Sequence, residues 1–288
     1  MAVLGDLQTC FHATRQDFYL PAGPARNDRT EITQPRRMAF LDRKSPWLPC
    51  RPTATPARLR LFCMPHAGGG AAEYQSWSAS LPATVQICPI LLPGRETRFS
   101  EPHYTDFDRL TEVLVRELRP HLEIPYAVFG HSMGALLAFE CVRRLQKSGS
   151  PAPLWLFVSG RRAPDGAVDP EPLHTLPDAE FLDRLNRIYR GIPEELLNNP
   201  EILDVFLPTI RADVSVVESY RFEEREPLEC PISAFAGETD SSVTWQQLLA
   251  WKRQTRRQFA AHIFPGGHFY PREPLLRSLS ATVSKLIE

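Results

Sequence analysis

The chain has 288 residues, 43% hydrophobic and 23% charged, which is close to an average soluble globular protein. This composition argues against a collagen, a coiled coil and a wholly disordered chain. Lysine and arginine total 33 against 34 acidic residues, a formal net charge of -1. The basic excess typical of a nucleic-acid-binding protein is lacking, so no nucleic-acid partner is expected.

The sequence carries no signal for a membrane or for secretion. No stretch approaches the roughly 18 consecutive apolar residues of a membrane helix. The N-terminus has no charged region followed by an apolar core, which a secretory signal requires. The six cysteines form no CxxC pair and show no regular spacing, and several lie in apolar runs. We therefore expect reduced thiols, a cytoplasmic protein and no membrane partner.

Residues 1–57 differ from the rest of the chain in amino-acid composition and hydrophobic patterning. They mix charges of both signs, show no sustained hydrophobic period and contain many prolines. Such a segment buries too little apolar surface to offset its chain entropy. We expect a disordered leader or a misassigned start over residues 1–57, followed by a folded domain over residues 58–288.

From Arg60 onward, short apolar runs alternate with longer helical patterns. Near-continuous apolar strands separated by helices are typical of a parallel sheet that is covered on both faces. The sequence therefore predicts an α/β fold whose strands lie at Leu61–Met64, Val85–Leu92, Tyr126–Phe129, Leu154–Val158 and Ile232–Phe235.

Helical patterns fill the remaining segments. A helix is expected to follow Ser132 and to end near Gly149, and a last helix carries an apolar stripe from Leu275 to Leu286. Residues 165–228 contain no strand pattern, and we call this segment the lid, because a helical insertion in such a sheet usually covers a pocket. Its alternative is a second small domain without a catalytic role. Three helices are expected in it, at Asp178–Tyr189, Glu194–Leu197 and Pro200–Tyr220.

The most specific motif is Gly-His-Ser-Met-Gly at residues 130–134. It follows an expected strand and opens an expected helix, as the nucleophile elbow of an α/β-hydrolase does. The two glycines give the tight turn room, and the turn places the hydroxyl of Ser132 at a helix N-terminus. Ser132 is therefore the candidate nucleophile.

A serine hydroxyl needs a base, and in this fold the acid and then the histidine follow the serine. Of the three histidines after Ser132, His268 lies in a glycine-rich loop between a strand pattern and the last helix. His262 lies inside that strand pattern and His174 lies in the lid. We expect His268 to be the base.

The acid has three candidates. Asp240 follows the expected strand at residues 232–235 and is the preferred one. Asp165 follows the preceding strand and is its rival, and Glu238 lies beside Asp240 and could substitute chemically.

An oxyanion hole needs two backbone N–H donors, one from the residue after the serine and one from the loop after an early strand. The first donor is expected at Met133 and the second at Ala67, within Pro-His-Ala-Gly-Gly-Gly at residues 65–70. That loop is not a phosphate loop, because no Gly-Lys-Ser/Thr follows it. His66 precedes the serine and is expected to shape the loop.

With these motifs assembled, the sequence resembles the type II thioesterases that accompany polyketide synthases and nonribosomal peptide synthetases. The resemblance extends to the medium-chain acyl-carrier thioesterase of animal fatty acid synthesis. It covers roughly residues 58–288, and its matching stretches lie at residues 65–69, 92–95, 130–135, 159–164 and 265–269. One departure is Thr-Asp-Ser at residues 239–241, where the family usually has Asp-Pro or Asp-Asp-Pro.

The resemblance implies an α/β-hydrolase fold with a helical lid and a triad of Ser132, Asp240 and His268. It also implies the substrate, an acyl group thioester-linked to the phosphopantetheine arm of an acyl or peptidyl carrier protein, and the task of editing aberrant acyl groups. No metal or organic cofactor is expected. Two alternatives stay open: a carboxylesterase or lipase of the same fold, and a non-enzymatic hydrolase-fold protein that binds a small ligand.

Overall fold

Six parallel strands form one sheet, in the order β2-β1-β3-β4-β5-β6. All five apolar runs that predict strands lie in this sheet, and the α/β fold class is confirmed. The predicted strand at residues 85–92 ends earlier, at Pro89. The strands are β1 (Leu59–Met64), β2 (Val85–Pro89), β3 (Tyr126–His131), β4 (Trp155–Ser159), β5 (Ile232–Gly237) and β6 (Phe259–Phe264).

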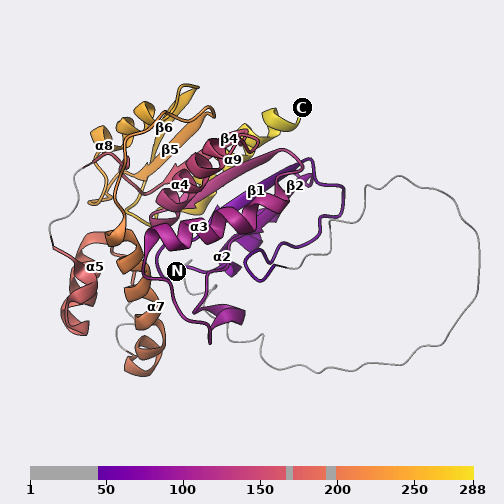
Figure 1. Cartoon of the computed structure of the whole chain (residues 1–288). Coiled ribbons are helices and arrows are strands. Elements are labelled where there is room, and N and C mark those ends of the chain that lie inside the picture. The colour runs from indigo at the N-terminus through magenta and orange to yellow at the C-terminus, as the bar shows by residue number, and fades with distance from the viewer. Residues whose placement is uncertain (1–44, 167–170, 193–198) are drawn as a thin grey trace, which may run out of the picture. The chain divides into compact units, whose positions relative to one another are not determined.

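The computed structural model describes residues 45–166, 171–192 and 199–288 (Figure 1). All of these except Ser45 belong to the compact unit Pro46–Glu288. Most of the expected leader (residues 1–44) and the expected helix at Glu194–Leu197 lie outside the described residues. The described α-helices are α2 (Ala72–Gln75), α3 (Phe107–Leu118), α4 (Met133–Lys147), α5 (Asp178–Tyr189), α7 (Pro200–Ser219), α8 (Trp245–Leu249) and α9 (Arg272–Ile287). Short 3₁₀ helices are η1 (Ser76–Ala79), η2 (Glu96–Arg98), η3 (Arg119–His121), η4 (Leu173–Thr175) and η5 (Ala250–Gln254).

Helix ends are set by local side-chain and backbone chemistry. The side chain of Asp106 accepts a hydrogen bond from the Arg109 amide at 2.8 Å and caps the start of α3. α4 ends where Gly149 takes a positive φ of 70°, a conformation that glycine adopts without steric cost, and its amide donates to Gln146. The helix end predicted near Gly149 is confirmed.

Each strand sends alternate side chains to opposite faces of the sheet, and each face has its own apolar core. Helices α3 and α4 cover one face and lie in front of the sheet in Figure 1. Helix α9 packs on the other face, together with Tyr74 and Trp77. Burying each large apolar side chain contributes roughly 1.5–3 kcal/mol, so these two layers fix the strand ends that carry the site.

Two residues well before β1 are part of the apolar core, although most of residues 51–58 between them and the strand are exposed. Trp47 and Leu48 are buried in the core that α3 and α4 cover. The Trp47 ring contacts Tyr104 edge-on, and the Arg98 guanidinium lies 4.1 Å from the Trp47 ring centre. Two residues of the segment expected to be a leader (residues 1–57) are therefore buried in the core of the described region.

The lid contains two described helices, α5 and α7, which pack on each other through their own small apolar cluster. Phe181 and Leu185 of α5 meet Leu207 and Val214 of α7 in that cluster. Figure 1 shows the two helices side by side and away from the strands. The helices predicted at Asp178–Tyr189 and Pro200–Tyr220 are confirmed, the second ending at Ser219.

Candidate active site

Ser132 lies at the junction of β3 and α4, in a strained turn. Its φ is 54° and its ψ is -113°, a conformation that non-glycine residues rarely adopt. The Ser132 amide donates to the carbonyl of Ser159 at the end of β4, at 2.8 Å, which holds the turn against the sheet. Ser132 is also the N-cap residue of α4, where the helix dipole favours negative charge.

The glycines on either side of Ser132 are required by close backbone contacts. A Cβ on Gly130 would lie 2.0 Å from the carbonyl oxygen of Gly134. A Cβ on Gly134 would lie 2.2 Å from the carbonyl oxygen of Met64, at the end of β1. The glycines of the motif therefore let the strand and the helix cross at the distance that the turn needs.

Asp240 and His268 form a buried pair on the loops after β5 and β6. The Nδ1 atom of His268 lies 2.9 Å from Oδ2 of Asp240, and both side chains are nearly inaccessible to solvent. Burial alone raises the pKa of Asp240, but hydrogen bonds from His268 and Ser242 and the charge of His268 outweigh it. The net pKa lies below the usual value of an aspartate. A lowered pKa favours the carboxylate form of Asp240 beside the His268 ring.

Ser242 is a site residue that the sequence reasoning missed. Its amide and its hydroxyl both donate to Oδ1 of Asp240, at 2.9 and 2.6 Å. Its hydroxyl also lies 3.2 Å from Nδ1 of His268. An aspartate that accepts from the amide two residues onward is a common turn, so the Asp240-Ser241-Ser242 order carried a signal.

The rival acids have other surroundings. Asp165 is bound by the guanidinium of Arg253, and Glu238 is exposed. The rival histidines are also engaged elsewhere. His174 pairs with Glu218 at 2.5 Å, and His262 stacks on Phe235 with ring centres 5.3 Å apart.

The two expected oxyanion donors lie at the ends of β1 and β3. Within the part of the chain that the structure describes, neither the Met133 amide nor the Ala67 amide donates to a protein acceptor. His66 places its Nδ1 atom 2.9 Å from the carbonyl of Ala67 and its Nε2 atom 3.2 Å from Glu73. His66 thereby contacts the loop itself, in line with the expected shaping role.

His131, directly before Ser132, contacts His268. Its ring centre lies 4.9 Å from that of His268, and its Nδ1 atom lies 2.8 Å from the hydroxyl of Ser159, which contacts Tyr270. Burial, aided by the charges of His268 and His66, holds the pKa of His131 well below the usual histidine value. A neutral His131 adds no positive charge beside His268.

The lid lies directly over these residues. The ring of Tyr189, the last residue of α5, lies 4.8 Å from the ring of His268. Ser132 is only 9% exposed, and no hydrogen bond among the described residues joins its hydroxyl to His268. Catalytic hydrogen bonds are often long before substrate binds, so the lack of this one among the described residues does not argue against the pair Ser132 and His268.

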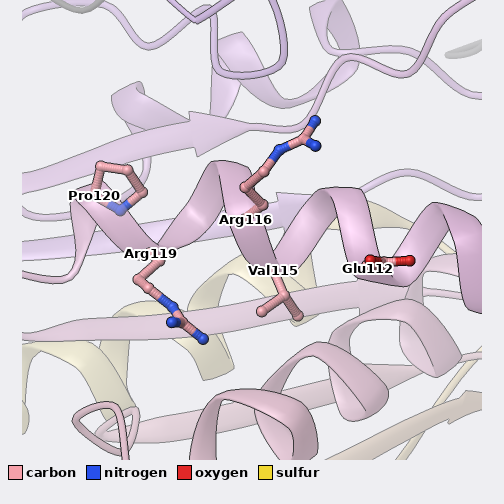
Figure 2. A pocket seen from close by; sticks show the side chains of 5 residues that line it. All are labelled: Glu112, Val115, Arg116, Arg119 and Pro120. Carbon is pink, nitrogen blue, oxygen red and sulfur yellow. The ribbon is translucent and has the colours of Figure 1, made fainter. Parts of the chain in front are cut away.

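Two surface hollows of the described region lie apart from these groups. One lies along α3 and η3, lined by Glu112, Val115, Arg116, Arg119 and Pro120 (Figure 2). The other lies between α4 and the segment after α7, with Asp108 of α3 also in its lining, and none of the expected site residues lines either hollow. Within the described ranges, no group of three or more His, Cys, Asp or Glu side chains could hold a metal ion. No helix in the described part of the chain is long and apolar enough to cross a membrane.

A parallel sheet, a serine on a strained strand-to-helix turn, and a carboxylate–histidine pair on later loops together define an α/β-hydrolase. Comparison with known proteins then gives the family. The thioesterase domain family matches residues 59–286. The gramicidin S biosynthesis protein GrsT of Aneurinibacillus migulanus is 42% identical over 233 residues, covering 81% of this chain and 91% of GrsT.

Further relatives agree with that match. Thioesterase PikA5 of Streptomyces venezuelae is 37% identical, over 74% of this chain and 75% of PikA5. The structure of BorB, the type II thioesterase from the borrelidin biosynthetic cluster, superposes with a TM-score of 0.75 at 34% identity, over 84% of this chain and 98% of BorB. The chain belongs to the thioesterase family, and the resemblance to type II thioesterases is confirmed. It is a thioester hydrolase of the serine-hydrolase type.

Proposed function

We propose that this enzyme hydrolyses acyl thioesters on the phosphopantetheine arm of acyl or peptidyl carrier proteins, and that it edits aberrant acyl groups in polyketide or nonribosomal peptide synthesis. The roles of its relatives support this substrate class, since GrsT is a gramicidin S biosynthesis protein and BorB is a type II thioesterase from the borrelidin biosynthetic cluster. A cytoplasmic location fits the free thiols at all five described cysteines.

The observation that carries the proposal is the buried Asp240–His268 pair together with Ser132 on its strained turn. In the first step, Oγ of Ser132 attacks the thioester carbonyl carbon while Nε2 of His268 takes the hydroxyl proton. Asp240 holds Nδ1–H of His268, which fixes the tautomer and stabilises the imidazolium.

The amides of Met133 and Ala67 donate hydrogen bonds to the carbonyl oxygen and stabilise the negative charge that develops on it. The tetrahedral intermediate collapses, the carbon–sulfur bond breaks, and His268 returns its proton to the departing carrier thiol. Water then attacks the acyl-serine, again with His268 as base, and releases the free acid and Ser132. Every proton taken by His268 is returned within the same half-reaction.

The test compares acyl-loaded carrier proteins with the same acyl groups on a small free thiol and with simple esters. We expect kcat/KM to be highest for the carrier-bound thioester and lowest for the ester. Ser132→Ala should abolish turnover of all three substrates, whereas Ser78→Ala, an exposed serine on η1, should leave it unchanged. Equal or better turnover of simple esters would favour a carboxylesterase, and ligand binding without turnover would favour a binding protein.

A further inference from the structure

A buried ion pair connects the lid to the loop that carries Ala67. Arg95 and Asp213 are 7% and 2% exposed, and their side chains meet in a bidentate pair with nitrogen–oxygen distances of 2.8 and 2.7 Å. Asp213 lies on the lid helix α7, whereas Arg95 follows β2 in the Leu-Pro-Gly-Arg stretch. The proposed mechanism gives neither residue a role.

Both residues of this pair also bind the backbone next to Ala67. The Gly68 amide donates to Oδ2 of Asp213 at 2.7 Å. The Arg95 guanidinium donates to the carbonyl of Gly69 at 2.8 Å. The pair therefore holds two consecutive residues of the loop from the side of the lid.

The two peptide groups that flank the Ala67 residue are each fixed by such contacts. The preceding group is held because the His66 carbonyl accepts from the Gly69 amide at 2.9 Å. The following group is held at both ends, by His66 Nδ1 on the Ala67 carbonyl and by Asp213 on the Gly68 amide. Of the N–H and C=O groups in these two peptide groups, the Ala67 amide alone has no protein partner among the described residues. Its position is therefore fixed, and it is free to donate to a substrate oxygen.

Other side chains of helix α7, near Asp213, also contact these loops. A Cβ on Gly68 would lie 3.0 Å from Cγ1 of Ile210, so the helix reaches van der Waals distance of the loop backbone. One turn before Asp213, the hydroxyl of Thr209 donates to the carbonyl of Gly94 at 3.0 Å. Helix α7 of the lid therefore packs on the loop that carries Ala67 and on the loop that carries Gly94 and Arg95.

We propose that Asp213, locked by Arg95, is a positioning residue that sets the oxyanion-binding amide of Ala67 and couples it to the seating of the lid. This inference rests on the proposed function, because it gives the Ala67 amide its role in that mechanism. The physical reason is preorganisation: an amide aimed at the developing oxyanion stabilises the transition state only if its direction is fixed beforehand. While α7 is packed on the loop, Asp213 holds the Gly68 amide, and the Ala67 amide points at the oxyanion position. If α7 moves away, the Asp213 carboxylate no longer binds the Gly68 amide, and the direction of the Ala67 amide is no longer fixed.

The test measures Asp213→Asn on a small free acyl thioester, so that carrier binding plays no part. Removing one oxyanion donor costs about 10²–10³-fold in kcat, so a misaligned donor should lower kcat by about 10–100-fold with KM changed less than about threefold. Affinity for an alkyl trifluoromethyl ketone, which forms an oxyanion on the active serine, should fall by the same factor as kcat/KM. A residue with a merely structural role would lower the melting temperature without this matched loss.

The matched control is Asp178→Asn, which removes another lid carboxylate. Asp178 pairs with Arg211 of α7 at 2.6 Å but is exposed and does not touch the Ala67 loop. We expect its kcat and inhibitor affinity to stay within about threefold of wild type. If Asp213→Asn fails to fold, Arg95→Lys decides, because it keeps the charge and loses the bidentate geometry, and the same matched loss is expected.

Three outcomes would count against the inference: equal kcat and inhibitor affinity in the Asp213 and Asp178 variants, a change in KM alone, or an Arg95→Lys variant with wild-type values. Failure of the proposed function would look different. A wild-type chain that binds the trifluoromethyl ketone but hydrolyses no acyl thioester would refute the substrate, while inhibitor affinities of the variants would still judge the role of Asp213.

Discussion

The carboxylate of Asp165 is bound by the guanidinium of Arg253, whose Nη2 and Nε atoms lie 2.7 and 2.8 Å from Oδ2. Asp165 and Asp240 follow adjacent strands of the sheet, β4 and β5, so either position could supply a triad acid. Their partners differ: Asp240 contacts His268, whereas Asp165 pairs with Arg253. This difference in partners is the basis of the first prediction.

Asp240→Asn should lower kcat by at least about 10²-fold, because an amide no longer holds the productive tautomer of His268. In serine proteases of the chymotrypsin type, replacing the triad aspartate by asparagine lowers kcat by about 10⁴-fold. Asp165→Asn should cost less than about tenfold, since its partner is Arg253. Steady-state kcat on an acyl thioester, with circular dichroism to confirm folding, measures both. A crippled Asp165→Asn beside an active Asp240→Asn would move the acid to the loop after β4.

The lowered pKa of Asp240 predicts how stability responds to acid. In the unfolded chain this carboxyl has an ordinary pKa of about 3.9, so near that pH the unfolded state binds more protons than the folded state. Its contribution to stability is therefore complete above about pH 5 and is lost as the pH falls through the folded-state pKa. Urea unfolding of wild type and Asp240→Asn from pH 7 to pH 3 should show the wild-type free energy falling more steeply. Parallel curves would contradict the lowered pKa.

Ser242→Ala should lower kcat by about 3–10-fold, less than Asp240→Asn does. The change removes the hydroxyl that binds Oδ1 of Asp240, and leaves that carboxylate with the Ser242 amide and His268. A net hydrogen bond to a charged group contributes about 1.5–3 kcal/mol, part of which should reach the transition state. The control is Ser241→Ala, whose hydroxyl donates to the carbonyl of Ile188 instead, at 2.8 Å. Equal kcat values for the two variants would show that the Ser242 hydroxyl has no role in turnover.

Trp47→Ala should lower the free energy of unfolding by about 3–5 kcal/mol, as loss of a buried aromatic side chain typically does. The ring is 7% exposed and packs against Tyr104 and Arg98. Urea denaturation measures the loss, and kcat of the folded protein should change little because Trp47 lies outside the site. A chain that starts at Met38 keeps Trp47 and should match the full chain within about 1 kcal/mol. A Trp47→Ala variant as stable as wild type would show that this segment is dispensable.

Much of the fold follows from local patterns in the sequence. Strands buried on both faces are mostly apolar, so β1, β3, β4 and β5 stand out as nearly continuous apolar runs. The strand-to-helix turn at Ser132 carries glycines at both flanks, and Gly149 ends the next helix. The packing of Trp47 could not be predicted, because a single tryptophan in a proline-rich stretch has no periodicity and its partners come from later loops.

The parts of the site that escaped prediction are those made by contacts between distant segments. Arg95 and Asp213 are 118 residues apart, and each looks like an ordinary charged residue in its own stretch. Tyr189 reaches His268 only because α5 folds back over the strand ends. A motif marks residues that share a loop, whereas a contact between a lid and a loop depends on how two elements pack.

The conformation of Ser132 also has a consequence for the protein as a whole. A non-glycine residue held at a positive φ costs of order 1–3 kcal/mol, comparable with a sizeable part of the 5–15 kcal/mol that keeps a typical domain folded. The two apolar layers of the sheet must supply that free energy for as long as the hydroxyl is presented. Ser132→Gly relieves the strain and also removes the hydroxyl, so the inactive variant should have the higher free energy of unfolding. In this protein, catalytic competence and resistance to unfolding are opposing demands on one backbone angle.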